Sequence, residues 1–458
     1  MSTMGKTSAA TPWQNWARTA HATPRSVAHP RDLGELVATV RAAAHTGLRV
    51  RAVGGGHSFT PAAVTDGVQV HLDAIDALER VAPQPDGTTH VTVGAGIRLR
   101  ALNTLLAQHG LAMRNLGDID KQSIAGAVST GTHGTGSRLG GLATQVVGAR
   151  LVLADGDVVE VSPTRHPELF ELARLGLGSV GVLAAVTLEV VPAFRLEARE
   201  EPWPLDRVLD ELEGPDGLVD GNDHFEFYWF PHTRRALTKR NNRVPDDVVR
   251  PLSPVRSWID DELLSNAMFA LTNRIATLVP PATVGINQLS SRALSARRYT
   301  APSAEVFVSP RRVRFREMEY AVPRESVADV LAEVDAWIEA SGERLPFPVE
   351  VRFAAADDLW LSTAHGRPTA YVAVHQNAHL PYTRYFTAVE RIAAQVGGRP
   401  HWGKLHWLDS EALARVYPRL CDAQRVRAEA DPGGTFSNAY LDQVLGPVPH
   451  DERAPRAA

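Results

Sequence analysis

A glycine run that ends in histidine is the first feature of this sequence that could do chemistry. The residues are Val53-Gly54-Gly55-Gly56-His57-Ser58, directly after a predicted strand over residues 49–53. Because glycine has no Cβ, backbone amides in such a run can approach a ligand closely, and a cluster of amides suits a diphosphate. The imidazole of His57 beside it could serve as a nucleophile or as a proton carrier. A plain glycine turn is the alternative explanation of the three glycines.

A second stretch, residues 122–136, combines small and hydroxylated side chains with almost no bulk. Its polar or glycine positions of interest are Ser123, Gly126, Thr130, His133 and Gly134. A flat ring system or a diphosphate could lie against such a surface, with hydroxyls and amides as hydrogen-bond donors. The alternative is a flexible linker, but the apolar Ile124 and Val128 favour packing against a core.

Two charged residues on a predicted strand form a third candidate. Glu350 and Arg352 alternate with apolar residues over 349–353, so both side chains point to the same face. A half-buried structural strand has the same pattern and is the alternative. His375 lies at the end of another predicted strand, and Lys404 lies in a turn-like stretch after a histidine, a tryptophan and a glycine.

One nucleotide-binding pattern is present in form only. Residues 176–181 fit G-x-G-x-x-G, which binds dinucleotides when a strand precedes it and a helix begins at it. Here a predicted helix over 167–175 precedes the pattern and a strand over 182–191 follows it. The sequence therefore predicts no Rossmann-type site.

The elements that must position these residues fall into two regions. The first region mixes helices and strands, predicted at 33–44, 49–53, 68–72, 90–93, 99–108, 151–161 and 182–191. A charged, proline-containing stretch over 192–213 marks the boundary. The second region has strands and helices predicted at 225–229, 323–340, 349–353, 369–375, 382–396 and 410–428, and the strand at 225–229 reads as half-buried. We therefore predict an antiparallel sheet with flanking helices for this region, and an α+β class for the whole chain.

The composition of the 458 residues excludes several kinds of protein. A net charge of -4, from Lys+Arg 48 against Asp+Glu 52, gives no basic field for nucleic acid. The single cysteine, Cys421, excludes an internal disulfide and cysteine-based zinc or iron–sulfur sites, and we expect no metal site. Cys421 itself is expected to be a small buried hydrophobe.

The sequence also bears on location. No apolar run reaches the ~20 residues that a membrane-spanning helix needs, and no secretory signal is predicted. We therefore expect the cytoplasm, and peripheral membrane contact is compatible with this expectation.

Together the motifs resemble the vanillyl-alcohol-oxidase (VAO) type of flavoprotein, and most closely its aldonolactone oxidase branch. That branch contains L-gulono-1,4-lactone and D-arabinono-1,4-lactone oxidases and dehydrogenases, with alditol oxidases as near relatives. The resemblance extends from about Trp13 to Leu445, and its most specific parts are residues 54–59, 123–136, 350–353 and 399–404. It implies a VAO/PCMH-type FAD-binding domain joined to a substrate, or cap, domain.

On this basis we expect four parts of the chain. They are an N-terminal extension (1–20), the FAD-binding domain (21–195), the cap domain (196–430), and a C-terminal segment (431–458) that packs back on the FAD-binding domain and ends in a disordered tail.

The resemblance implies FAD as the cofactor, bonded covalently to His57, whose neutral imidazole is a suitable nucleophile. It also implies that the named residues of the 122–136 stretch contact the diphosphate and the ring system, and that Val182 contacts the adenine end. Gly117 and Asp118 correspond to positions beside the reactive edge of the ring. A small residue at 117 leaves O2 a path, which favours oxidase behaviour, although Gly117 could simply form a turn.

The implied reaction is oxidation of a hydroxyl by hydride transfer to flavin N5. The relatives place the lysine that corresponds to Lys404 at the flavin. Arg352 and Lys404 would stabilise negative charge on substrate oxygen or on the reduced ring. The general base stays open between Glu350, His375 and Lys404.

The expected substrate is L-gulono-, L-galactono- or D-arabinono-1,4-lactone, and the electron acceptor is O2 or another oxidant. The alternatives are an alditol oxidase acting on polyols such as xylitol or sorbitol, a secondary-metabolism oxidase of the same fold, and a flavin-binding protein without turnover. The sequence predicts no particular oligomeric state.

Overall fold

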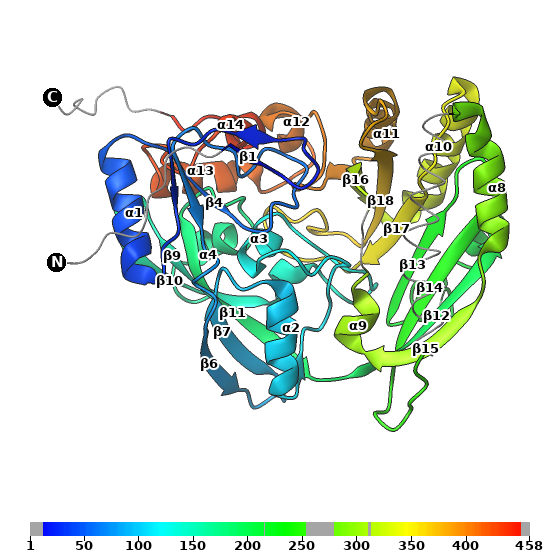
Figure 1. Ribbon diagram of the computed structural model, residues 1–458, viewed down its shortest axis with the longest axis horizontal. Coiled ribbons are helices and arrows are strands. Elements are labelled where there is room, and N and C mark those ends of the chain that lie inside the picture. The colour runs from blue at the N-terminus through cyan, green and yellow to red at the C-terminus, as the bar shows by residue number, and fades with distance from the viewer. Residues whose placement is uncertain (1–11, 215, 253–278, 310–312, 450–458) are drawn as a thin grey trace.

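The chain folds into two lobes, each with its own hydrophobic core (Figure 1). The computed structural model describes residues 12–214, 216–252, 279–309 and 313–449. The start of the N-terminal extension and the predicted disordered tail from residue 450 lie outside the described residues.

The first lobe contains a two-stranded sheet of β1 and β2, two further sheets and short helices. Its small parallel sheet has the strand order β3-β5-β4, and its larger antiparallel sheet has the order β10-β9-β11-β7-β6, with β8 paired to β11. The strands are β1 (Trp13–Gln14), β2 (His21–Ala22), β3 (Ser26–Ala28), β4 (Val50–Val53), β5 (Val68–His71), β6 (Leu78–Pro83), β7 (Thr89–Gly94), β8 (Leu111–Ala112), β9 (Val146–Val152), β10 (Val158–Val161) and β11 (Val182–Pro192). The helices are α1 (Leu33–His45), α2 (Leu99–Gln108), α3 (Ile124–Ser129), the 3-10 helix η1 (Leu142–Gln145) and α4 (Pro167–Arg174).

The helix predicted at 33–44 shows why these segments fold as they do. Asp32 caps α1 by accepting a hydrogen bond from the amide of Glu35, which satisfies one of the free donors at the helix start. Leu36, Val40 and Ala43 recur at helical spacing and are buried against the sheet. This prediction is confirmed by the structure.

The second lobe is one eight-stranded antiparallel sheet with the order β15-β12-β14-β13-β17-β18-β16-β19. The strands are β12 (Arg195–Pro204), β13 (His224–Trp229), β14 (Arg235–Val244), β15 (Arg297–Pro302), β16 (Phe315–Pro323), β17 (Val349–Ala354), β18 (Thr369–Asn377) and β19 (Arg399–Pro400). The helices are α5 (Leu205–Asp210), η3 (Pro280–Ala282), α8 (Thr283–Ala293), α9 (Ser303–Phe307), η4 (Arg324–Ser326), α10 (Val327–Ser341) and α11 (Thr383–Gln395). The mixture of antiparallel sheets and helices confirms the α+β class.

The eight-stranded sheet has one apolar and one charged face. Phe227, Val351 and Val372 belong to the apolar face, which packs with α5, α10 and α11 into the core of this lobe. The strand at 225–229 was predicted to be half-buried, and that prediction is wrong. Glu226 on its other face is also buried, because basic side chains on the neighbouring strands cover it.

The C-terminal helices return to the first lobe, where they pack beside its N-terminal part (Figure 1). They are α12 (Ser410–Ala414), α13 (Leu420–Ala430) and α14 (Ala439–Leu445). The prediction of a single helix over 410–428 is therefore wrong. The helix is interrupted between α12 and α13, where Pro418 lies. The prediction for Cys421 is wrong too. It is exposed, since α13 buries Leu420 and Ala423 on its other side.

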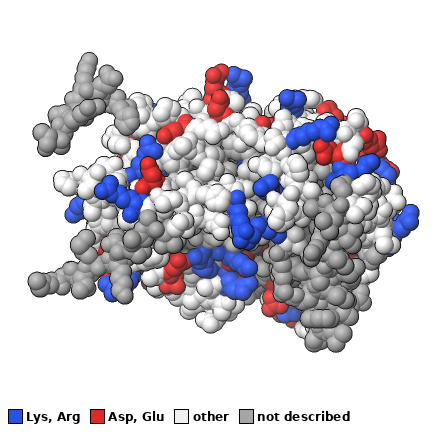
Figure 2. Space-filling view, turned by 45° about the horizontal axis from the view of Figure 1, so that its top comes forward, with Lys and Arg blue, Asp and Glu red and all other residues white. Residues whose placement is uncertain are grey.

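No helix among the described residues is long and apolar enough to cross a membrane. On the face shown in Figure 2, basic and acidic side chains lie interspersed rather than gathered into one charged field.

Candidate active site

A cavity in the first lobe gathers most of the predicted cofactor residues. It lies between the loop after β4, helix α3 and the start of β11. The predicted residues that line it are Val53, Gly54, Gly55, Gly56, His57, Ser58, Ser123, Gly126, Thr130 and Val182. Segments that are more than 100 residues apart in the sequence therefore meet around one space.

The loop after β4 is built to present its backbone to this cavity. A Cβ on Gly54 would lie 2.3 Å from Oγ of Ser123, so the loop approaches the start of α3 more closely than a larger residue would permit. Within the described residues, the amides of Gly55, Gly56 and His57 donate to no protein acceptor. Unpaired amides beside a close-packed glycine loop fit a diphosphate, which accepts several hydrogen bonds at once.

His57 stands at the end of this loop in an environment that keeps it neutral. Burial lowers the pKa of its imidazole to about 4, and the positive charges of Lys121 and Arg98 act in the same direction. Its ring stacks on Trp16, with 5.8 Å between the ring centres. A neutral imidazole retains the lone pair that a nucleophile needs.

Sequence reasoning missed the floor of the cavity. Arg51 on β4 is buried and donates to the backbone carbonyls of Ala62, Leu177 and Phe436 at 2.9, 2.6 and 2.6 Å. Leu177 belongs to the glycine pattern rejected above as a Rossmann site, and it lines the cavity together with Phe436 from the C-terminal segment. No sequence signal distinguishes Arg51, because it is a single charged residue in a short strand.

The charged face of the second lobe holds the other candidates. Arg352 on β17 forms ion pairs with Glu350 on the same strand, with Glu226 on β13 (3.0 Å), and with Asp118 of the first lobe (3.5 Å). Burial opposes its charge, but these three carboxylates raise the pKa of the guanidinium well above its ordinary value. The hydroxyl of Tyr228 donates toward Glu350 at 2.9 Å.

Glu317 on β16 brings together the two remaining candidates. Its carboxylate lies 2.5 Å from Nζ of Lys404 and 3.5 Å from Nε2 of His375. Burial alone would raise the pKa of Glu317, but Lys404 and His375 lower it to about 2. Burial also opposes the charge of Lys404, while Glu317 and Glu319 raise its pKa above the ordinary value. Lys404 is therefore an ammonium group at neutral pH.

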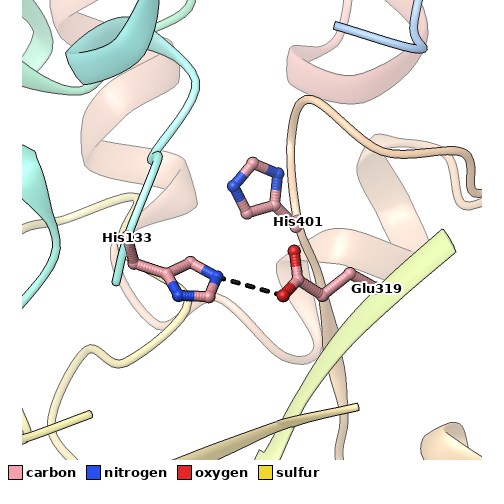
Figure 3. A group of neighbouring side chains, drawn as sticks. All are labelled: His133, Glu319 and His401. Atoms are coloured by element: carbon pink, nitrogen blue, oxygen red, sulfur yellow. Dashed lines mark ion pairs between the residues drawn. The ribbon is translucent and has the colours of Figure 1, made fainter. Parts of the chain in front are cut away.

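A third group joins the two lobes, as Figure 3 shows for His133, Glu319 and His401. Nε2 of His133 lies 3.2 Å from the carboxylate of Glu319, and its Nδ1 donates to the carbonyl of the next residue at 2.9 Å. His401 accepts a hydrogen bond from the amide of Gly403 and donates to the carbonyl of Gly131. Both ring nitrogens of His401 are thus engaged, so the trio forms a buried ion pair with a neighbouring histidine rather than three free metal ligands.

Comparison with known proteins was made against families, curated proteins and solved structures. Residues 186–444 match the family model described as D-arabinono-1,4-lactone oxidase, and residues 24–162 match that of an FAD binding domain. The L-gulono-1,4-lactone dehydrogenase of Mycobacterium tuberculosis is 40% identical over 435 residues, which cover 95% of this chain and 99% of that protein.

The chain belongs to the D-arabinono-1,4-lactone oxidase family.

Other relatives agree with this membership. The L-gulonolactone oxidase of Bos taurus is 34% identical, covering 94% of this chain and 98% of that protein. Among solved structures, cholesterol oxidase from B. sterolicum has a TM-score of 0.78 and 20% identity, covering 95% of this chain and 96% of that chain. That likeness concerns the fold alone. The resemblance derived from the motifs is thereby confirmed.

Some predicted residues of this family member do not line the cavity. They are Gly117, Asp118, His133, Gly134 and Lys404, which lie where the first lobe meets the second. Gly117 is closely packed there, since a Cβ on it would lie 3.1 Å from the carbonyl oxygen of His133. A larger residue at 117 would therefore have to displace its neighbour slightly, so packing also favours a small residue here.

The sequence analysis also missed three carboxylates of the charged face, Glu226, Glu317 and Glu319. A signal for them was available. Each alternates with apolar residues on a strand, as Glu350 does, so all three are expected on the face opposite the apolar core. What the sequence alone could not supply is the order of the strands, which brings these carboxylates together.

Proposed function

We propose that this chain oxidises a hydroxyl of a sugar-acid 1,4-lactone, with FAD held in the cavity of the first lobe. The observation that carries the proposal is the convergence of Glu350, Arg352, His375 and Lys404 on one charged face. Family membership supports the same reaction, because the matched family and the closely similar bacterial and bovine proteins are named for lactone oxidation.

FAD, when bound, accepts the hydride removed from the carbon that bears the hydroxyl. The residues of the chain supply binding and charge. Arg352 and Lys404 both remain positively charged at neutral pH, so they can stabilise negative charge on the substrate oxygen.

The proton of the hydroxyl needs an acceptor. We do not assign this role to Lys404, because its carboxylate neighbours raise its pKa and so favour the ammonium form at neutral pH. Glu350 already accepts hydrogen bonds from Arg352 and Tyr228. His375 donates from Nδ1 toward the carbonyl of Pro348 at 3.3 Å, and its Nε2 lies 3.5 Å from the carboxylate of Glu317 and 3.9 Å from that of Glu350. We therefore keep His375 and Glu350 as the two candidates for the base.

An anaerobic substrate screen tests this function. The purified yellow protein is mixed with L-gulono-, L-galactono- and D-arabinono-1,4-lactone, and separately with xylitol and sorbitol. We expect rapid bleaching of the flavin by at least one lactone. Bleaching by polyols alone would instead identify an alditol oxidase, and bleaching by none of the five would refute the proposal.

The electron acceptor is tested with the reduced protein. Because residue 117 is a glycine, which leaves more room for O2 than a larger side chain would, we propose that O2 reoxidises the flavin. Mixing reduced protein with oxygenated buffer should then restore the yellow colour within seconds. Restoration by a dye or cytochrome but not by O2 would identify a dehydrogenase.

A further inference from the structure

We propose that Glu226 and Lys239 are positioning residues that hold Arg352 against Glu350. This inference rests on the proposed function, because it assigns a role in the same site. Neither residue is among the candidates that the sequence indicated, and both lie on strands other than those that carry the candidates.

Glu226 is the centre of the arrangement. Its carboxylate lies 3.0 Å from Nε of Arg352, 3.1 Å from Nζ of Lys239 and 3.2 Å from the hydroxyl of Tyr228. Arg352 and Tyr228 both also contact Oε1 of Glu350, and the single hydroxyl proton of Tyr228 is shared between the two carboxylates. One buried carboxylate therefore fixes Arg352, a neighbour of a residue that we place in the reaction.

The sheet register shows that this contact is part of a longer row. Arg297 on β15, Glu200 on β12, Lys239 on β14, Glu226 on β13 and Arg352 on β17 stand directly opposite one another on successive strands. Charges alternate in sign along the row, so each buried group has an oppositely charged neighbour. The row ends at Arg352, beside Glu350.

A row of buried ion pairs contributes little net stability to a sheet. Buried ion pairs lose much of their attraction to the cost of removing charges from water, and apolar side chains of similar volume often stabilise a fold as well or better. What the charged row supplies is orientation. Arg352 has a hydrogen-bond acceptor at Nε, so its Nη2 faces Asp118 and Glu350.

Lys239 acts through the charge of Glu226. Burial opposes ionisation of this carboxylate, but Lys239 and Arg352 lower its pKa to about 2. The titratable or charged groups around Glu226 are Lys239, Arg352, Asp118, Tyr228 and His224. Without Lys239 the pKa of Glu226 must rise, and its protonated form no longer holds Arg352 as an ion pair.

The test compares pH profiles of kcat/KM for the holoenzyme and three variants. In Lys239→Met we expect kcat/KM to fall more steeply toward acid pH than in the wild type, because protonation of Glu226 then adds to protonation of the general base. Lys239→Arg should restore the wild-type profile. Glu226→Gln, which resembles the protonated carboxyl, should be impaired across the whole pH range.

Arg240→Met is the matched control. Arg240 adjoins Lys239 on β14, is similarly buried, and pairs with Glu201 on β12, but it points to the other face of the sheet. We expect it to lose thermal stability and keep the wild-type pH profile. If Lys239→Met also keeps that profile, with only its stability reduced, the positioning role is refuted.

The two proposals fail in different ways. The wild-type arm contains no substitution, so absence of bleaching by any lactone overturns the proposed function alone. The ratio between each variant and the wild type is measured with whichever hydroxyl donor bleaches the flavin. A variant-to-wild-type ratio of one at every pH, for both Lys239→Met and Glu226→Gln, overturns the positioning role alone.

Discussion

At the scale of single residues, the neutral state of His57 bears directly on the proposed bond to FAD. With a pKa of about 4, its imidazole is a free nucleophile throughout the neutral range. We expect FAD to become attached to the apoprotein equally well between pH 6 and pH 9, and attachment to fail as the pH approaches 4. Acid precipitation after each incubation measures it, because attached flavin stays in the pellet.

His57→Ala supplies the control for that experiment. The amides of the glycine loop do not depend on the imidazole, so the variant should still take up FAD and release it on precipitation. Colour that stays with the precipitated variant would place the bond elsewhere.

Glu350 and Lys404 give a second prediction. Glu350→Gln removes the carboxylate that meets Arg352 and Tyr228, and Lys404→Met removes an ammonium that is paired with Glu317. Each should slow anaerobic flavin reduction by about 10²-fold or more, the usual scale for loss of a charge or proton acceptor at the reacting atoms. Stopped-flow bleaching measures the rate. FAD content should be unchanged, and normal reduction in both variants would refute these roles.

Residue types with unusual chemistry could be predicted from the sequence, whereas ordinary carboxylates could not. The glycine loop, His57 and the pair at 350 and 352 stand out by type and spacing. Glu317 and Glu319 do not, because a glutamate that alternates with apolar residues is common on any exposed strand. Their significance depends on His375, Lys404 and His133, which arrive from distant segments.

At the scale of elements, strand β16 connects the two lobes. Its Glu319 pairs with His133 of the first lobe, and the ring of His133 stacks on Tyr371 of β18 at 3.5 Å. Breaking a buried pair by removing one charge typically costs about 3–5 kcal/mol. We expect Glu319→Gln to lower the free energy of unfolding by roughly that amount, measured by urea denaturation.

An exposed pair provides the comparison. Arg207 and Glu211 lie one helical turn apart on α5 and are both about half exposed. Arg207→Met should cost less than about 1 kcal/mol. Equal losses in the two variants would show that the bridge between the lobes contributes no more than a surface contact.

Most elements could be predicted because their patterns are local. The spacing of Leu36, Val40 and Ala44 predicts α1 without knowledge of anything else. The errors arose where the deciding partner is distant or where a breaker was overlooked. Glu226 is buried by residues on other strands, and the helix over 410–428 was predicted across Pro418.

At the scale of the whole molecule, the buried carboxylates should govern acid stability. Glu226 and Glu317 have pKa values of about 2 in the folded protein, against the ordinary pKa of 4.5 for a glutamate side chain. A carboxylate whose pKa is lowered by folding stabilises the fold above pH 4.5. This contribution is lost as the pH falls toward 2. Each carboxylate should account for about 3 kcal/mol of this loss.

Urea midpoints across the pH range measure the effect. We expect a nearly constant midpoint from pH 7 to pH 5 and a steep fall below pH 4.5. Glu226→Gln, which carries no charge to lose, should show a shallower fall than the wild type. A midpoint that stays level down to pH 3 would contradict the assignment of these two groups.

The contacts of Arg51 have a consequence for how the protein acquires its cofactor. Arg51 and Phe436 are 385 positions apart, yet their hydrogen bond helps to form the cavity floor. Contacts of such long range form late in folding, since a long loop must close first. The cavity is thus complete only after the ribosome has delivered the C-terminal segment, and we expect the flavin to be loaded after synthesis.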